Sequence, residues 1–111
     1  MDGSFDQAFP HEHSYGATAF ILQPLLLTYQ IMSAELSASD RAICETGLLR
    51  AARFLTSHAE THDLISNHLA GAALALLHSG DFFHQSEFTA AGNKLIEFIL
   101  KHQDPEGWFP E

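Results

Sequence analysis

Two stretches of this chain are apolar on nearly every helical face, and they constrain the fold more than any other feature. Residues 17–32 contain AFILQPLLL, and a second stretch, which begins near Asn67, contains HLAGAALALLH. A helix that is apolar all round must be surrounded by protein or lipid. The helices expected between and after these stretches carry apolar residues on one face only. Such alternation of inner and outer helices is typical of stacked helical hairpins.

The positions of capping and breaking residues give the expected bounds of each element. Residues 1–13 read as an irregular lead-in, and Pro24 is expected to kink the first helix. Ser39 is expected to cap the second helix, and Gly80 to end the third. The tail, QDPEGWFPE, reads as a turn or loop. The expected helices cover residues 14–34, 40–57, 67–80 and 87–101.

Two all-round apolar helices cannot be enclosed by only two amphipathic partners. We therefore predict an all-α fold of about two stacked helical hairpins, as a segment of an (α/α) toroid, with residues 1–111 forming one incomplete domain. The helix near Asn67 should be the most buried, with Ala72 and Ala73 enclosed. The exposed apolar edges are expected to drive self-association or pairing with the missing part of the domain.

Charge excludes one class of partner. The chain has 14 acidic and 5 basic residues, a formal charge of -9, and its basic residues form no patch. Nucleic acid is therefore not an expected partner. The acidic N-terminus rules out a signal peptide, so the default compartment is the cytoplasm. The apolar run 17–32 is shorter than the ~20 residues of a membrane span, and no membrane partner is expected. Cys44 is expected to be a buried, inert thiol.

The segment Ser66-Asn67-His68 is the main candidate for chemistry. It lies where a loop becomes a helix, and the free N–H groups of a helix start favour anions. An amide and an imidazole could donate hydrogen bonds to a carboxylate there. The alternative is structural: Ser66 or Asn67 caps the helix, and His68 is a polar residue of its first turn.

Histidine pairs raise the question of a metal. His58 and His62 have a spacing that zinc uses, but HAETH places its glutamate differently from the metalloprotease pattern. His11 and His13 are a weak signal for the same reason. We predict no metal and no cofactor.

Four segments together resemble the heparinase II/III-like family of polysaccharide lyases. They are HEHSYGATAF from His11, ETH from Glu60, ISNHLAGAA from Ile65, and HQDPEGWF from His102. The resemblance covers roughly residues 11–111 in matching order. It implies an α/α-toroid followed by a β-sandwich, and cleavage of uronic-acid polymers such as heparan sulfate or alginate by β-elimination.

The resemblance also implies roles for individual residues. Asn67 and His68 match the position that neutralises the substrate carboxylate, so that negative charge can build beside it when C5 loses its proton. His13, Tyr15, His62 and Trp108 are candidates for binding the acidic polysaccharide. The family's tyrosine acid normally follows the Glu-Gly-Trp-Phe motif, where this sequence ends. Tyr15 and Tyr29 lie elsewhere, so we expect the chain to be a fragment that is inactive alone.

Two alternatives remain. The chain could be a non-catalytic helical interaction module whose apolar edges bind a partner. It could also be part of a terpenoid-cyclase-like toroid, because residues 98–108 are similar to the Gln-Trp motif of those enzymes. The spacing of that motif differs by one residue here, and no Asp-x-Asp-Asp proton donor is present.

Overall fold

The computed structural model describes residues 1–60 and 65–110, and four α-helices form within them. The helices are α1 (Tyr15–Met32), α2 (Ala38–Ser57), α3 (Ser66–Phe83) and α4 (Ser86–Lys101), and a short 3-10 turn, η1 (Ser33–Glu35), joins α1 to α2. Among the described residues no strand forms, and Phe5 and Ser14 make one isolated β-bridge. The predicted all-α class is confirmed.

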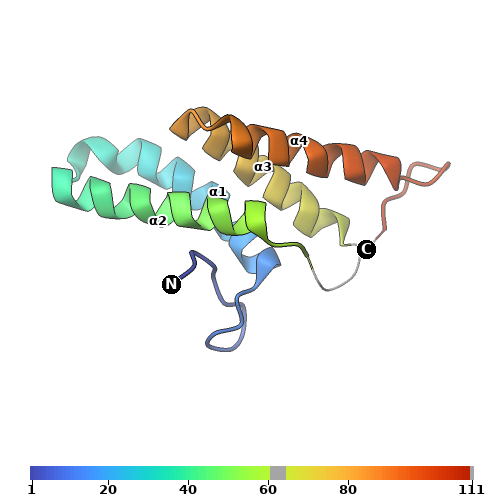
Figure 1. The fold of residues 1–111 in the computed structure, drawn as a ribbon, viewed down its shortest axis with the longest axis horizontal. Coiled ribbons are helices and arrows are strands. Elements are labelled where there is room, and N and C mark those ends of the chain that lie inside the picture. The colour runs from blue at the N-terminus through green and yellow to red at the C-terminus, as the bar shows by residue number, and fades with distance from the viewer. Residues whose placement is uncertain (61–64, 111) are drawn as a thin grey trace.

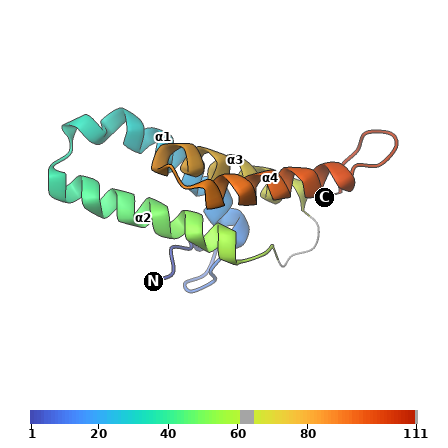
Figure 2. The ribbon, with the colours of Figure 1, turned by 45° about the horizontal axis from the view of Figure 1, so that its top comes forward.

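The four helices make two hairpins that point the same way (Figure 1). Because α1 and α3 run in one direction and α2 and α4 run back, both hairpin turns lie at one end of the molecule. The starts of α1 and α3 and the ends of α2 and α4 lie at the other end, which we call the loop end (Figure 2). The lead-in and the tail also lie there, so the loop end gathers most of the irregular chain.

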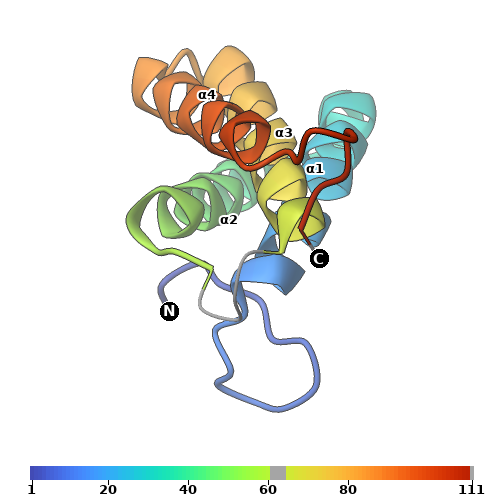
Figure 3. The ribbon, with the colours of Figure 1, turned by 90° about the vertical axis from the view of Figure 1, so that its right-hand side faces the viewer.

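Helix α3 is the centre of the packing. Viewed from the loop end, it lies among the other three helices (Figure 3), and it contacts each of them. Eight of its residues are buried, against five of α2 and two of α4. Ala72 is fully enclosed and Ala73 is 2% exposed. The expected burial of this helix is therefore confirmed.

Helix α1 has apolar residues on both its inner and its outer side. Leu22 and Leu26 are completely buried in the core, whereas Leu25, Leu27 and Ile31 are 40%, 46% and 81% exposed. Two hairpins thus leave part of an all-round apolar helix uncovered, as its composition indicates.

Three expected helix ends were misplaced. Helix α2 is capped by Ser37 rather than Ser39: the Ser37 hydroxyl accepts from the Asp40 N–H at 3.1 Å and donates to its carboxylate at 2.7 Å. This reciprocal pair satisfies a free helix-start donor, which Ser39 inside the first turn cannot do. Helix α1 continues through Pro24 to Met32, and η1 occupies the residues that follow.

Gly80 does not end α3. The helix continues to Phe83, and His84 ends it in the left-handed conformation with φ of 54°. Gly80 instead lets α4 approach: a Cβ there would lie 2.3 Å from the Thr89 hydroxyl and 2.9 Å from its backbone nitrogen. A glycine in an apolar helix can mark close helix packing as well as a helix end, and here it does the former.

Candidate active site

The strongest candidate site lies at the loop end, where the first turns of α1 and α3 meet the loop after α2. His68, in the first turn of α3, is half-buried, and its Nδ1 lies 2.7 Å from a carboxylate oxygen of Glu60. The Glu60 side chain is only 3% exposed. A buried carboxylate needs such a partner, because losing water is costly for a charge.

Helix α1 forms the other wall around the His68 ring. A Cβ on Gly16 would lie 2.7 Å from Nδ1 of His68, so the ring packs directly on the backbone of α1. Phe20, one turn further along α1, contacts the same ring edge-on, with centroids 5.5 Å apart. Glu60, Gly16 and Phe20 therefore hold the imidazole in one orientation.

Tyr15 lies beside this cluster but is 6% exposed. Burial, and then the nearby charge of Glu60, raise the pKa of Tyr15 to about 12. Tyr15 and Glu60 also line a cavity of about 870 Å³ between α2, α3 and α4. The apolar lining of this cavity includes Leu55, Leu69 and Leu95, and the structure places Tyr15 as a packing residue next to the candidate site.

Asn67 is exposed in the first turn of α3, and it does not cap the helix. The N-cap residue is Ile65, which makes no side-chain capping bond. Ser66 is buried as the first helical residue, and its N–H donates to the carbonyl of Pro110 at 3.2 Å. The structural alternative for Ser66 and Asn67 is therefore wrong, because both residues lie inside the helix, one and two positions too late to cap it.

His13 is exposed and belongs to a lead-in that is folded on itself. Its Nδ1 lies 2.9 Å from the carboxylate of Asp2 and 2.8 Å from the Ser4 hydroxyl. Although serine, histidine and aspartate meet here, both contacts use the same ring nitrogen, which is not the relay of a nucleophilic triad. The Asp6 carboxylate accepts three backbone N–H groups, from residues 11, 12 and 13, and these bonds lower the pKa of Asp6.

The remaining predicted contacts are separate from His68. Trp108 is 71% exposed in the tail, where its backbone N–H donates to the Asp104 carboxylate at 2.9 Å. The tail returns to the start of α3 through the bond between Pro110 and Ser66. His62 lies outside the described residues. His58, its expected zinc-spaced partner, stacks on Phe54 with centroids 4.2 Å apart.

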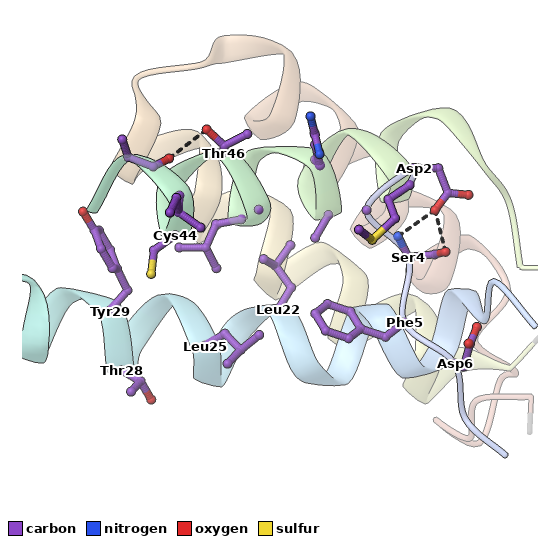
Figure 4. Close-up of a pocket in the computed structure, with 18 of the residues that line it drawn as sticks. Asp2, Ser4, Phe5, Asp6, Leu22, Leu25, Thr28, Tyr29, Cys44 and Thr46 are labelled. Atoms are coloured by element: carbon purple, nitrogen blue, oxygen red, sulfur yellow. Dashed lines mark hydrogen bonds between the residues drawn. The ribbon is translucent and has the colours of Figure 1, made fainter. Parts of the chain in front are cut away.

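A groove of about 1050 Å³ lies away from this cluster, between α1, α2 and the lead-in. Its walls are mainly apolar, with Leu22 and Leu25 on one side and Cys44 on the other (Figure 4). The expectation that Cys44 is buried is wrong, since the thiol is exposed on the groove-facing side of α2. Tyr29, at one end of the groove, donates to Glu45 at 2.6 Å.

Two further expectations concern membranes and metals. By length and composition, the 21 residues Tyr15–Glu35 are sufficient to cross a membrane, so the expectation that the run is too short is wrong. In the structure, Leu22, Leu26 and Tyr29 of this stretch are buried against the other helices, whereas only 28% of its most apolar window is buried. Within residues 1–60 and 65–110, no group of three or more His, Cys, Asp or Glu side chains could hold a metal ion.

Comparison with known proteins identifies the family of this chain. The family model described as the ulvan lyase N-terminal domain matches residues 1–109. The chain belongs to this family. No curated protein and no solved structure matched the chain. The expected class, a polysaccharide lyase, is confirmed at that level, and the family model does not name the heparinase II/III type.

Sequence reasoning missed two residues of the cluster in this ulvan lyase N-terminal domain. Glu60 was noticed only as part of a motif, although it holds His68. Gly16 was noticed in the same way, although it is the residue on which the ring packs. The signal for Gly16 was a glycine in the first turn of a helix, where close approach of another side chain is one of few reasons for it.

Proposed function

We propose that this domain supplies the carboxylate-neutralising side of a β-elimination site, in a lyase that cleaves uronate-containing polysaccharides. The observation that carries the proposal is the state of Asn67. Its side chain is exposed at a helix start and makes no capping bond, and it stands next to a histidine held by a buried carboxylate. Asn67 is thus available to a ligand.

The chemistry requires hydrogen-bond donors at this place. Removing the C5 proton of a uronate pushes negative charge toward its carboxylate, and donors aimed at that charge lower the barrier. The Asn67 amide donates without adding a permanent charge, and the start of α3 adds the partial positive charge of its free N–H groups. His68 donates or accepts through the ring nitrogen that Glu60 does not occupy.

The acid that protonates the leaving oxygen is proposed to come from outside this domain. The chain has two tyrosines. Tyr15 is 6% exposed, and Tyr29 is 7% exposed and donates to Glu45 near the C-terminal end of α1, away from the loop end. We therefore expect the isolated chain to form no unsaturated uronate product from ulvan, alginate or heparan sulfate. Clear product formation by the purified chain would contradict this part of the proposal.

Asn67 can be tested in a lyase that contains this domain. Asn67→Ala should lower kcat by about 10²–10³, with a smaller change in KM, as for loss of one donor to a developing oxyanion. Asn67→Asp should be at least as damaging, because it places a carboxylate against the substrate carboxylate. Both variants should keep the free energy of unfolding within about 0.5 kcal/mol, since the residue is exposed and caps nothing. A fully active Asn67→Asp enzyme would remove the basis of the proposal.

An interaction module is the second candidate, and the outer side of α1 favours it. Leu27 and Ile31 are exposed there as neighbours on one helical face. Apolar residues of this kind pack against another helix when one is supplied. Light scattering on the chain and on Ile31→Glu tests this: association that the substitution abolishes supports an interface at α1, and a monomer in both cases excludes self-association through it.

A further inference from the structure

The geometry assigns Glu60 as the residue that positions His68. We infer that its carboxylate accepts the Nδ1 proton of the imidazole and fixes the ring, so that Nε2 of the protonated ring donates to the uronate carboxylate of a substrate. This inference rests on the proposed function for the role of Nε2. The pairing of Glu60 with His68 is independent of it.

The contact between His68 and Glu60 is short and shielded from water. Nδ1 of His68 and a Glu60 oxygen are 2.7 Å apart, a short distance for a nitrogen–oxygen hydrogen bond and usual where one partner is charged. The Glu60 side chain is 3% exposed and that of His68 is 25% exposed. A carboxylate so well shielded from water gains more from a hydrogen bond than one at the surface, so this pair should be well populated.

The Glu60 carboxylate also selects the tautomer of His68. An ionised carboxylate can only accept, so the shared proton resides on Nδ1. The neutral ring then has its lone pair on Nε2, whereas a protonated ring donates from Nε2 and has its charge balanced by Glu60. Orientation of one histidine nitrogen by a carboxylate on the other is how proteins usually fix the role of an imidazole.

The His68 ring cannot easily turn. Gly16 lies against the ring: a Cβ built on it would lie 2.7 Å from Nδ1 and 2.8 Å from Cε1 of His68. Phe20 packs edge-on against the same ring. A 180° flip of the ring would bring carbon atoms opposite the Glu60 oxygen and forfeit the hydrogen bond. The backbone of α1 and the Glu60 carboxylate therefore set the same orientation.

Long-range proton–nitrogen correlation spectra of the 111-residue chain decide the inference. They are recorded on the neutral imidazole, which shows which nitrogen carries the proton. We expect His68 to carry it on Nδ1, in contrast to the Nε2 form that free imidazole side chains prefer. In Glu60→Gln, the Nδ1 form should lose at least about tenfold in population, which is the effect of about 1.4 kcal/mol. Glu97→Gln, at an exposed position of α4, is the matched control and should change nothing at His68.

A proton on Nε2 of His68 in the unsubstituted chain would overturn the inference without any variant. An Nδ1 form that persists unchanged in Glu60→Gln would overturn it as well. The spectra do not depend on catalysis, so a domain without lyase chemistry could still show the Glu60 effect. In that case the proposed function would fail while the pairing stands.

The effect of Glu60 on catalysis is tested in a lyase that contains this domain. Glu60→Gln should lower kcat/KM about 10-fold to 100-fold, by analogy with partners that orient metal-bound histidines, and Glu97→Gln should not. Loss of activity together with loss of the Nδ1 proton supports positioning. Unchanged kcat/KM in Glu60→Gln would overturn the positioning role.

Discussion

Gly16 and His68 are in such close contact that a single methyl group on Gly16 would overlap the imidazole. The position of a Cβ on Gly16 lies 2.7 Å from Nδ1 and 2.8 Å from Cε1 of His68. Gly47 is a contrast, because nothing lies within 4 Å of the corresponding position in the middle of α2. Comparing substitutions at the two glycines therefore distinguishes two effects: the low helix propensity of glycine, which applies at both sites, and the need for space, which applies only at Gly16.

We predict opposite results for alanine at these two sites. Gly47→Ala should raise the free energy of unfolding by about 0.5–1 kcal/mol, because alanine is the better helix former and meets no neighbour. Gly16→Ala should give no such gain, because the methyl group displaces the His68 ring from Glu60. Denaturant unfolding measures the first effect, and the side-chain resonances of His68 report the second. An equal gain in stability at both sites would show that Gly16 is not needed for the ring.

The core should respond most strongly at Phe88. This side chain is fully buried in α4, whereas Phe98 on the same helix is 42% exposed. Phe88→Ala should destabilise the chain by about 3–5 kcal/mol, through lost burial and the cavity left behind. Phe98→Ala should cost about 1 kcal/mol or less. Thermal or denaturant unfolding of both variants checks the prediction, and similar losses at the two sites would contradict the packing of α4.

Because Tyr15 is buried, we predict that the folded chain loses stability in alkali. Its pKa is raised from 10.0 to about 12 by burial and by Glu60. The unfolded chain releases this proton near pH 10, whereas the folded chain retains it until about pH 12. Above pH 10 the folded state therefore binds more protons, and stability falls as the pH rises through this interval.

The expected contribution of Tyr15 is about 1–2 kcal/mol, reduced from the full effect of the pKa shift because solvent screens part of it. The measurement is the free energy of unfolding at several pH values between 9 and 12, expressed as the difference between the unsubstituted chain and Tyr15→Phe. This difference removes the parallel contribution of Tyr29, whose pKa is also raised to about 12, chiefly by its hydrogen bond to Glu45. A difference that does not vary with pH would argue against a buried Tyr15.

For Asp6 we predict the opposite pH dependence: its contribution to the stability of the chain is lost in acid. Hydrogen bonds from the backbone N–H groups of residues 13, 11 and 12 lower its pKa. The contribution of these bonds is complete above the ordinary range of an aspartate and is lost as the pH falls through the lowered value. Asp6→Asn removes one acceptor oxygen and the charge. Amide exchange at residues 11–13 should then be at least about fivefold faster, as for the loss of an ordinary hydrogen bond, with exchange in α3 as the control.

Much of the helical framework could be predicted because it depends on composition. The apolar stretches of α1 and α3 indicated that they belong inside, and the one-sided pattern of α4 indicated that it covers them. What failed depends on contacts between distant segments. Nothing local distinguishes a glycine that ends a helix from Gly80, which makes room for Thr89 of α4.

The candidate site could be predicted only in part for the same reason. The motif located Asn67 and His68, but a one-residue difference in the helix start decided whether Ser66 is a cap. Glu60 and His68 are eight residues apart in the sequence, and no periodic pattern there indicates that they pair. Hydrophobic periodicity indicates which face of a helix is buried, but it does not indicate which loop side chain reaches that face.

The parallel direction of α1 and α3 has a consequence for engineering this protein. Both hairpin connections, at Ser33–Glu35 and around His84 and Gln85, lie at the end opposite Asn67 and His68. Residues at these connections are largely exposed, and η1 contains no buried residue. Fluorophores, purification tags or cross-links attached there would remain more than half the length of a helix away from the proposed chemistry. Labels can therefore be attached at the hairpin turns, and the proposed site at the loop end can be altered, with little effect of one change on the other.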